Sequence, residues 1–405
     1  MKPKILYLSD SALGITGYGN QTKEICKRAE QDFDVYHVGW NYTGQPLRYA
    51  RTTDGEEFNF KILPGSMNAP YAQPILQEYI DNIQPDIFMC LLDTFMVYPW
   101  ILNYNLGKSI FYYPSDGGWF PQNCEIILRK FTHPIAMSKF AQEQIRNTYG
   151  IRTEYIPHGT NTSIYYTLNL EMKAALRKKY SQIFNYDLTN KFIVGSVTRN
   201  QGRKMMDRTF KSFAELCKHT DNAVLMMHSD PRDPAAVSDL NYLASRLGIA
   251  HRIIWTGMNV TKGFGYQQMM ELYNLFDVHF LSTSGEGFGI PTIEAMACEV
   301  PILQTDYTTT KEIVTDNGAG LGIKMLGETE PLYPAERMSE QIVGTWNVER
   351  GLCEIKDAAE KLKYLMDSPE ERMKMGTNGR KAVLKYYDWN KVYPLWKKKF
   401  EEMLH

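Results

Sequence analysis

The chain has 405 residues, enough for about two domains that each bury their own core. Hydrophobic residues make up 43% and charged residues 22% of the sequence, which is typical of a soluble globular protein and excludes a disordered chain, a collagen-like repeat and a coiled-coil rod. The 45 basic and 46 acidic residues nearly cancel, so the composition shows no basic surplus of the kind that drives binding to nucleic-acid phosphates.

Short apolar runs bounded by turn residues recur along the chain, separated by longer amphipathic stretches, and this alternation is typical of βαβ units. Most runs are continuously apolar, as expected of parallel strands buried on both faces. We therefore predict an α/β protein with two Rossmann-like, doubly wound domains that face each other across a cleft. The predicted strands are 5–8, 33–38, 87–92, 110–113 and 135–137 in the first half, and 192–197, 224–227, 253–255, 278–281 and 301–304 in the second.

Two segments mark the domain organisation. Pro157 and Gly159 lie between the two strand series and are followed by a polar, helix-like stretch, as expected at a domain junction. The stretch 389–404 has apolar residues at helical spacing and predicts a closing helix packed on a core. We predict domains 1–170 and 171–385, a closing helix within 386–405, and an inserted loop or hairpin at 326–350.

The six cysteines are widely spaced, which fits neither a zinc site nor a dense disulfide framework, so a reducing cytoplasm is the expected location. No apolar run approaches the roughly 18 residues of a membrane span. The first run, 5–8, is too short for a signal-peptide core. We expect no integral membrane segment, and any membrane contact to be peripheral.

A glycine-rich loop with Gly14, Gly17 and Gly19 follows the first predicted strand. Its order is G-x-x-G-x-G and not the G-x-G-x-x-G of dinucleotide folds. A nicotinamide-dependent oxidoreductase would also need an acidic ribose contact after the second strand, where Asn41 and Tyr42 lie instead. An oxidoreductase is therefore the weaker alternative.

Basic residues follow the first strand of the second half. Arg199 and Lys204 come just after 192–197, and the carboxyl ends of strands in an open α/β sheet border the ligand crevice. Arginine binds phosphate bidentately and lysine binds it as a point charge. These two residues are candidates for neutralising a diphosphate.

The segment 284–297 carries the strongest pattern. Glycines surround Glu286, so backbone amides can approach a ligand closely, and Pro291 suits the start of a helix whose free N–H groups can bind phosphate. Glu294 follows in what we expect to be the first turn of that helix. The two carboxylates, one on a loop and one on a helix, can reach different ends of one extended ligand.

The run EGFGIPTIEAMA, which contains Glu286 and Glu294, resembles the paired-glutamate signature of retaining glycosyltransferases of the GT-B fold, specifically glycosyltransferase family four. The stretches 272–278 and 311–314 resemble its flanks, and Arg199 and Lys204 match its diphosphate-binding pair. The segments 156–159 and 387–389 resemble the inter-domain segment and the start of the closing helix, which in the family crosses back onto the first domain.

The resemblance implies a retaining, hexosyltransferase-like enzyme that moves a sugar from a UDP- or GDP-sugar. It implies that Glu294 contacts the ribose, and that Glu286 and the following amides contact the donor sugar. Arg199 and Lys204 would stabilise the leaving diphosphate. The residues expected to bind the donor are Gly17, Gly19, Gly287, Phe288, Gly289, Ile290 and Glu294, and those expected to be catalytic are Arg199, Lys204, Glu286 and Asp116.

Departures from the family pattern predict an unusual donor preference. Asp116 stands where many members have a histidine at the sugar, so the role of that histidine is not carried over and the role of Asp116 stays open. Thr308, Thr309 and Thr310 replace a loop that is commonly rich in glycine, and Glu299 occupies a position that is commonly glycine.

No metal and no cofactor is implied, because the basic pair offsets the diphosphate charge and the nucleotide sugar is itself the donor substrate. Asp230 and Asp233 are explained by turn chemistry. The first domain is expected to bind the acceptor through Asp93, Tyr113 and Trp119. The acceptor stays open between a glycan, a lipid, a protein, a small molecule and a nucleic-acid base, and a noncatalytic sugar-nucleotide binding protein also stays open.

Overall fold

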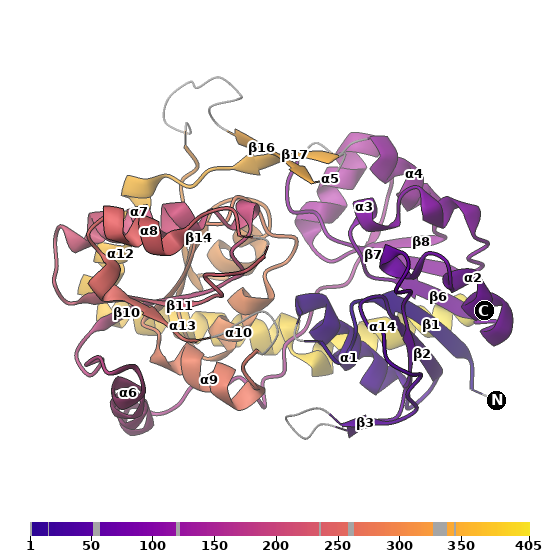
Figure 1. The fold of residues 1–405 in the computed structure, drawn as a ribbon, viewed down its shortest axis with the longest axis horizontal. Coiled ribbons are helices and arrows are strands. Elements are labelled where there is room, and N and C mark those ends of the chain that lie inside the picture. Colours follow the sequence, from indigo (N-terminus) through magenta and orange to yellow (C-terminus); the bar gives the residue numbers. More distant parts are fainter. Residues whose placement is uncertain are drawn as a thin grey trace. The chain divides into compact units, whose positions relative to one another are not determined.

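A computed structural model of the chain describes residues 2–14, 16–51, 57–118, 122–234, 236–257, 263–326, 338–343 and 346–405. The chain divides into two compact units (Figure 1). Each unit is built on its own parallel sheet with helices on both faces, which confirms the predicted fold class. The first unit contains Met1–Gly159, Ile342–Val348 and Trp389–His405, and the second contains Thr160–Gln341 and Glu349–Asp388.

The sheet of the first unit has the order β5-β2-β1-β6-β7-β8-β9. Every neighbouring pair is parallel, and all strands predicted in the first half of the sequence are present. A separate small antiparallel pair is formed by β3 (Ala50–Arg51) and β4 (Glu57–Phe58). The strands of the main sheet are β1 (Lys4–Ser9), β2 (Asp34–Gly39), β5 (Lys61–Pro64), β6 (Ile87–Cys90), β7 (Ser109–Tyr113), β8 (His133–Ala136) and β9 (Glu154–Tyr155).

The closing helix α14 (Trp389–Leu404) belongs to the first unit, beside α1 (Gly17–Ala29). Its apolar stripe is buried as predicted, and the ring of Trp396 packs edge-to-face on Tyr112 of β7 at 4.7 Å. A β-carbon on Gly159 would lie 2.6 Å from the ring of Trp389, so glycine is needed there. The remaining helices of this unit are α2 (Leu76–Ile83), α3 (Thr94–Val97), α4 (Gln122–Lys130) and α5 (Lys139–Tyr149), with short turns η1 (Pro70–Ala72) and η2 (Trp100–Asn103).

The sheet of the second unit has the order β12-β11-β10-β13-β14-β15, which is the doubly wound order of mononucleotide-binding folds. All strands predicted in the second half are present. The edge strand β15 is not predicted by the sequence because two of its four residues are glycine. The strands are β10 (Phe192–Val197), β11 (Ala223–His228), β12 (Ile253–Trp255), β13 (Val278–Leu281), β14 (Ile302–Thr305) and β15 (Gly320–Ile323).

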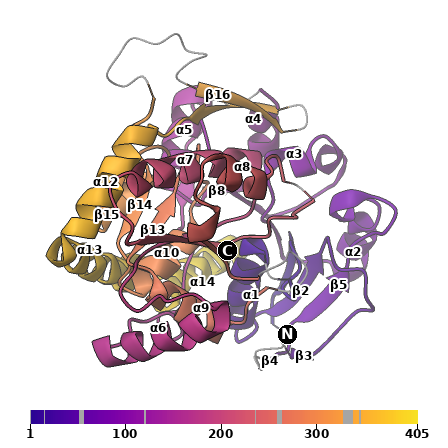
Figure 2. The same ribbon diagram turned by 60° about the vertical axis from the view of Figure 1, so that its left-hand side comes forward.

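Helices cover both faces of this second sheet (Figure 2). Buried side chains of α7 (Met206–Cys217), α8 (Leu240–Arg246) and α12 (Ile355–Asp367) form one core with the sheet. Helix α9 (Tyr266–Leu275) packs on α6 (Leu170–Phe184), and α10 (Ile290–Ala297) packs on α13 (Pro369–Ala382). The short elements are η3 (Gly202–Lys204), η4 (Ala250–Arg252), η5 (Lys311–Thr315) and η6 (Val383–Tyr387).

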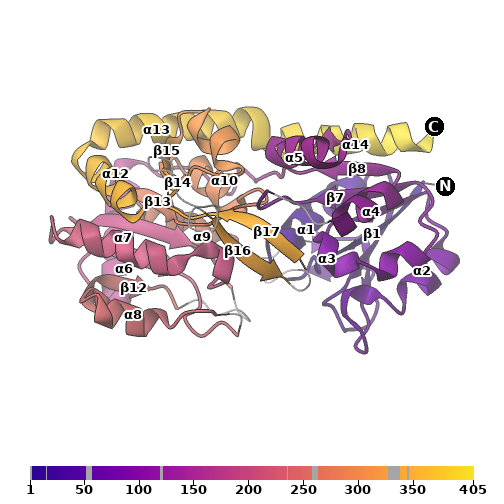
Figure 3. The same ribbon diagram turned by 90° about the horizontal axis from the view of Figure 1, so that it is seen from above.

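The segment predicted as an inserted loop or hairpin contains the paired strands β16 (Met338–Val343) and β17 (Trp346–Gly351), drawn in gold in Figure 3. They form a two-stranded sheet separate from both main sheets. Residues 327–337 and 344–345 lie outside the described part of the chain.

The strand orders locate the ligand crevice in each unit. In a doubly wound sheet, ligands bind beyond the carboxyl ends of the two strands where the order reverses. These strands are β1 and β6 in the first unit and β10 and β13 in the second. The loops that follow β10 and β13 contain most of the residues predicted to bind a donor.

The six cysteines are all free thiols, and each lies in a described part of the chain. Within the described ranges, we find no helix with both the length and the apolar character that crossing a bilayer requires.

Candidate active site

The loops after β10 and β13 are fixed to each other by hydrogen bonds. The backbone N–H of Ser284 donates to the carbonyl of Arg203 at 2.7 Å, and the Ser282 hydroxyl donates to the carbonyl of Met205 at 2.6 Å. The short helix η3 is thereby held against the glycine-rich loop. This pairing brings Lys204 to Glu286, although 82 positions separate them in the sequence.

Glu286 is the buried centre of an ion cluster. Its side chain is 6% exposed, the ammonium of Lys204 lies 2.5 Å from Oε1, and the guanidinium of Arg203 lies 3.0 Å from Oε2. Burial alone would raise the pKa of Glu286, but Lys204 and Arg203 outweigh it and lower the pKa to about 2. Glu286 is therefore an anion at neutral pH.

Arg199 is not part of this ion cluster. Its guanidinium binds the carboxylate of Asp233 bidentately, with Nε 2.5 Å from Oδ2 and Nη2 3.1 Å from Oδ1. The Arg199 side chain is 48% exposed while that of Asp233 is fully buried. The structure therefore brings only Lys204 of the predicted basic pair to Glu286, and it adds Arg203, which the sequence analysis did not select.

The predicted explanation of the two aspartates by turn chemistry holds for Asp230, whose Oδ1 accepts a hydrogen bond from the backbone N–H of Arg232 at 2.8 Å. For Asp233 it is incomplete, because Asp233 also anchors Arg199. Among the residues that the structure describes, no group of three or more His, Cys, Asp and Glu side chains is arranged to hold a metal ion.

The glycine-rich loop ends at Gly289, the N-cap of α10, with φ of 100° and ψ of 61°. Only glycine adopts such a conformation without strain. The loop carbonyl of Phe288 accepts a hydrogen bond from the Thr309 hydroxyl at 2.9 Å, while the Phe288 side chain is buried against Tyr387. The ring of Phe288, a predicted donor-binding residue, is thus part of the core.

The three consecutive threonines support this loop. The backbone N–H of Glu286 donates to the Thr308 hydroxyl at 3.0 Å, and the side-chain amide of Gln304 donates to Thr310 at 2.9 Å. Thr308 has φ of 54°, a left-handed conformation that is unusual for a β-branched residue. The threonines therefore replace glycine flexibility with a hydrogen-bonded framework under Glu286.

Glu294 lies one residue further along α10 than predicted, just past its first turn. The helix begins at Ile290, so Glu294 is its fifth residue, and no acidic residue occupies the first turn. The prediction is wrong because the helix starts one residue before Pro291, which takes the second position. Burial raises the pKa of Glu294 to about 7, and the hydroxyls of Tyr273 and Tyr165 oppose that rise.

The glycine-rich loop of the first unit leads into α1. The Thr16 hydroxyl accepts a hydrogen bond from the N–H of Gly19 and donates one to Asp10 at 2.6 Å. A β-carbon on Gly19 would lie 2.6 Å from the carbonyl oxygen of Ser11, so the turn requires glycine at that position. Gly17 is the first residue of α1, and Ile15 lies outside the described residues.

The residues predicted to bind the acceptor are found in different environments. Asp93 follows β6 and accepts a hydrogen bond from the Tyr18 hydroxyl at 3.0 Å, which joins the loop after β6 to the start of α1. Asp116, which was predicted to be catalytic, is half-buried in the loop after β7. Tyr113 is 1% exposed and its hydroxyl pairs with Thr153 at 3.0 Å, so it is a core residue without a surface for an acceptor. Trp119 lies outside the described residues.

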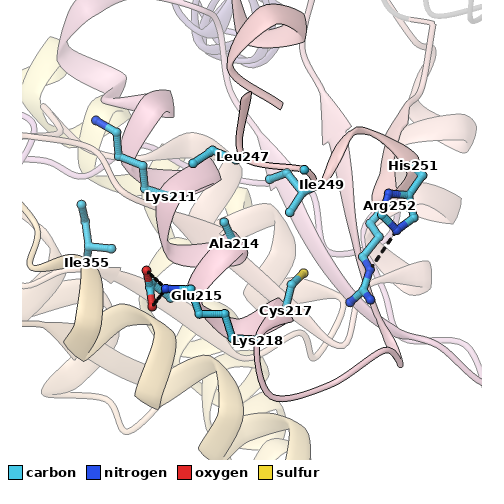
Figure 4. A pocket seen from close by; sticks show the side chains of 11 residues that line it. Lys211, Ala214, Glu215, Cys217, Lys218, Leu247, Ile249, His251, Arg252 and Ile355 are labelled. Atoms are coloured by element: carbon cyan, nitrogen blue, oxygen red, sulfur yellow. Dashed lines mark hydrogen bonds and ion pairs between the residues drawn. The ribbon is translucent and has the colours of Figure 1, made fainter. Parts of the chain in front are cut away.

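A pocket of about 490 Å³ lies elsewhere in the second unit, beside α7 and η4 (Figure 4). Lys211, Lys218 and Arg252 line it, and each of them already pairs with an acidic side chain. It contains none of the residues predicted from the sequence. The candidate site is therefore the cluster at the end of β10 and β13.

These features are those of a protein with the GT-B fold. Sucrose-phosphate synthase from Thermosynechococcus elongatus has a similar structure, with a TM-score of 0.73 at 15% identity, covering 100% of this chain and 99% of that one. Anabaena Alr3699/HepE, solved in complex with UDP and glucose, gives a TM-score of 0.70 at 14% identity, covering 99% of this chain and 100% of that one.

The sequence gives a more specific similarity. Residues 179–325 match the family model described as Glycosyl transferases group 1. The chain is 23% identical over 257 residues to the capsular polysaccharide biosynthesis glycosyltransferase CapM of Staphylococcus aureus, a match that covers 64% of this chain and 55% of CapM.

A second relative is the GDP-mannose-dependent alpha-(1-6)-phosphatidylinositol monomannoside mannosyltransferase of Mycolicibacterium smegmatis. It is 24% identical over 194 residues, which covers 45% of this chain and 47% of that protein. The chain thus spans about half the length of these curated relatives.

Proposed function

We propose that this protein is a glycosyltransferase that moves a sugar from a nucleoside-diphosphate donor to an acceptor with retention of anomeric configuration. The observation that carries the proposal is the pairing of Lys204 and Arg203 with the buried Glu286 at the switch point of the second sheet. It lies within the segment that matches Glycosyl transferases group 1. The match to that family, the relatives and the fold all support a glycosyltransferase.

The chemistry follows from where charge develops. When a nucleoside diphosphate leaves, negative charge grows on the departing oxygen and the sugar becomes oxocarbenium-like. Fixed cations and the N-terminal end of α10 stabilise that state more than the ground state. We assign the cationic role to Lys204 and Arg203. The guanidinium of Arg199 is paired with Asp233 instead.

Glu286 has the acceptor oxygens to bind donor sugar hydroxyls, and the amides of Gly287, Phe288 and Gly289 follow it in the loop. The carboxylate of Glu294 binds the ribose of the nucleotide. In a retaining mechanism of this kind the acceptor attacks the face that the diphosphate leaves, and the leaving phosphate accepts the proton. The new bond joins the acceptor oxygen to the anomeric carbon, and the bond to the diphosphate breaks.

The donor is proposed to be a UDP- or GDP-sugar. The similar Anabaena protein was solved with UDP, and the Mycolicibacterium relative is named for GDP-mannose. Contacts of Gly17 and Gly19 with the donor and of Asp116 and Asp93 with the reacting groups stay predictions, as does a cytoplasmic location. We also propose that no metal or other cofactor is required, because fixed cations offset the diphosphate charge.

The test is slow donor hydrolysis with a panel of UDP- and GDP-sugars, with and without a chelator. Release of UDP or GDP from one donor, unchanged by the chelator, is expected. Reduction of NAD without binding of any nucleotide sugar would instead identify an oxidoreductase. Tight binding without turnover, even after acceptors are screened, would identify a noncatalytic binding protein.

A further inference from the structure

The tyrosine that hydrogen-bonds Glu294 belongs to an aromatic cluster. The hydroxyl of Tyr273, from α9, donates to Glu294 Oε2 at 2.8 Å. The ring of Tyr165 meets that of Tyr273 edge-to-face at 5.9 Å, and the rings of Phe276 and His279 each lie 6.0 Å from Tyr273. Tyr273 is 0% exposed, so its hydroxyl is fixed in direction by packing on several sides.

The charges around this carboxylate come from several elements. Two hydroxyls, those of Tyr273 on α9 and Tyr165, oppose the effect of burial on Glu294. The positive charges of Lys173 on α6 and Arg380 on α13 oppose the rise that burial causes in the pKa of the Cys298 thiol, at the end of α10. The guanidinium of Arg380 also donates to the backbone carbonyl of Tyr165 at 2.6 Å. The tyrosine hydroxyls are therefore the groups that orient the carboxylate itself.

We propose that Tyr273 is a positioning residue, whose hydroxyl holds the Glu294 carboxylate in the orientation that accepts hydrogen bonds from the two neighbouring hydroxyls of a ribose. This proposal rests on the proposed function, because it takes the ligand to be a nucleotide. An ionised carboxylate only accepts hydrogen bonds and has room for several, so one bond from Tyr273 leaves acceptor sites for a ribose. Since the tyrosine hydroxyl favours the ionised form, it also sets the pH above which the ribose is bound well.

The test is the pH dependence of UDP and GDP binding, measured by calorimetry from about pH 6 to about pH 9 on the whole chain. Tyr273→Phe is expected to bind about tenfold more weakly at neutral pH, the size of one hydrogen bond to a charged group. Its binding midpoint should move to higher pH, so that part of the loss is recovered at alkaline pH. Tyr165→Phe should shift the midpoint in the same direction.

Tyr180→Phe is the matched control, because the Tyr180 hydroxyl donates to another glutamate of the same unit, Glu271, at 2.9 Å. It should leave both the affinity and the midpoint unchanged. A wild-type midpoint in Tyr273→Phe, with an equal loss of affinity at every pH, would show a purely structural role and overturn the proposal. So would an identical shift in Tyr180→Phe.

Failure of the proposed function gives a different result. If the wild-type protein binds no nucleotide, the function is wrong, and the role of Tyr273 is read in the ligand-free protein instead. The carboxyl titration of Glu294 is followed by carbon-13 NMR, with Glu294→Gln to identify its signal. Tyr273→Phe is expected to raise that pKa, and an unchanged titration would overturn the positioning role.

Discussion

The two glutamates of the candidate site are the same residue type in opposite electrostatic states. Glu286 is buried and Glu294 is partly buried, and loss of water disfavours the charged form of each. Glu286 has two cations within 3.0 Å and a pKa of about 2, whereas Glu294 has tyrosine hydroxyls and a pKa of about 7. One carboxylate is a fixed anion and the other titrates near neutral pH, which suits them to different parts of a ligand.

Lys204→Ala is expected to lower turnover more than donor affinity. The ammonium sits 2.5 Å from Glu286 and is assigned to charge that develops only as the diphosphate leaves, so its loss affects the transition state most. A loss of about a hundredfold in kcat with a change of a few-fold in donor Kd is expected, as for removal of one stabilising group. Steady-state rates and calorimetric Kd values measure the two quantities.

Lys211→Ala is the control for this change, because Lys211 is a more exposed lysine of the same unit that pairs with Asp207 on its own helix. It should leave kcat and Kd unchanged. Equal losses of turnover and affinity in Lys204→Ala would reject the charge-stabilising role of Lys204.

At the scale of elements, the site depends on a loop whose conformation is fixed by hydrogen bonds from another segment of the chain. The glycine-rich loop ends in a left-handed residue, Gly289, and Thr308 and Thr309 bind its backbone on either side of Gly287. The loop therefore gains order from a neighbouring segment after β14 and not from its own sequence. Such preorganisation lowers the entropic cost of ordering the loop when a ligand binds.

Gly289→Ala should both destabilise the second unit and weaken nucleotide binding. Its φ of 100° strains any side chain, and the new β-carbon would lie 3.1 Å from the Thr292 hydroxyl. A cost of roughly 1–3 kcal/mol in the free energy of unfolding is expected. Urea unfolding and UDP or GDP binding at a temperature where the variant is folded measure the two effects.

Gly150→Ala provides the comparison, because Gly150 also has positive φ, 67°, but its β-carbon would meet nothing within 4 Å and it caps α5 in the first unit. It should lose about 1 kcal/mol of stability with nucleotide affinity intact. If Gly289→Ala binds nucleotide as the wild type does, the loop is not part of the donor site.

At the scale of the whole molecule, each unit buries two histidines. Burial lowers the pKa of His37 and His228 to about 4 and that of His158 and His279 to about 3. The unfolded chain binds their protons near pH 6.5, so it binds more protons than the folded chain below that pH. Stability therefore falls as the pH drops below about 6.5, in both units.

Glutamates modify this profile with opposite signs. Glu294 holds its proton more tightly in the folded state, so it reduces stability as the pH rises from about 4.5 to about 7. Glu286 contributes stability above about pH 4.5 that is lost as the pH falls toward 2. Several histidines outweigh one glutamate between about pH 4.5 and 6.5, so the net slope is positive there.

Urea unfolding at about pH 5 and about pH 7.5 should therefore give a lower stability at the acidic pH, by roughly 1.4 kcal/mol per net proton and pH unit. His228→Asn, in which the amide can replace the contact of Nδ1 with the Thr256 hydroxyl at 2.9 Å, should flatten the slope of the second unit. His251→Gln, at an exposed position, should leave the slope unchanged. A slope that is flat in the wild type would contradict the assignment of neutral buried histidines.

Much of the fold follows from local pattern. The strands in the middle of each sheet are continuous apolar runs, so their position is readable residue by residue, and the stripe of α14 is readable from its spacing. The edge strands β5, β9 and β15 escape prediction because they are short or partly exposed, and their ladders depend on the neighbouring strand and not on their own residues.

The candidate site was only partly readable for the same reason. The glycine-rich loop, Pro291 and the carboxylates have signatures in adjacent residues. Nothing in the sequence around Arg199 and Arg203 indicates which of the two arginines contacts Glu286. The turn η3 carries Arg203, and an ion pair holds Arg199 to Asp233, which is 34 positions away in the sequence. These two features of the tertiary structure decide which arginine contacts Glu286.

The sequence by itself determined the two series of strands, the loop that begins α10 and the residue types available for a diphosphate and a sugar, because these depend on neighbours along the chain. Only the tertiary structure decided which cation meets which carboxylate, that Tyr113 is core, and that Glu286 and Glu294 differ in charge. Those outcomes depend on burial and on contacts between distant residues, which appear only when the sheet brings the ends of its strands together.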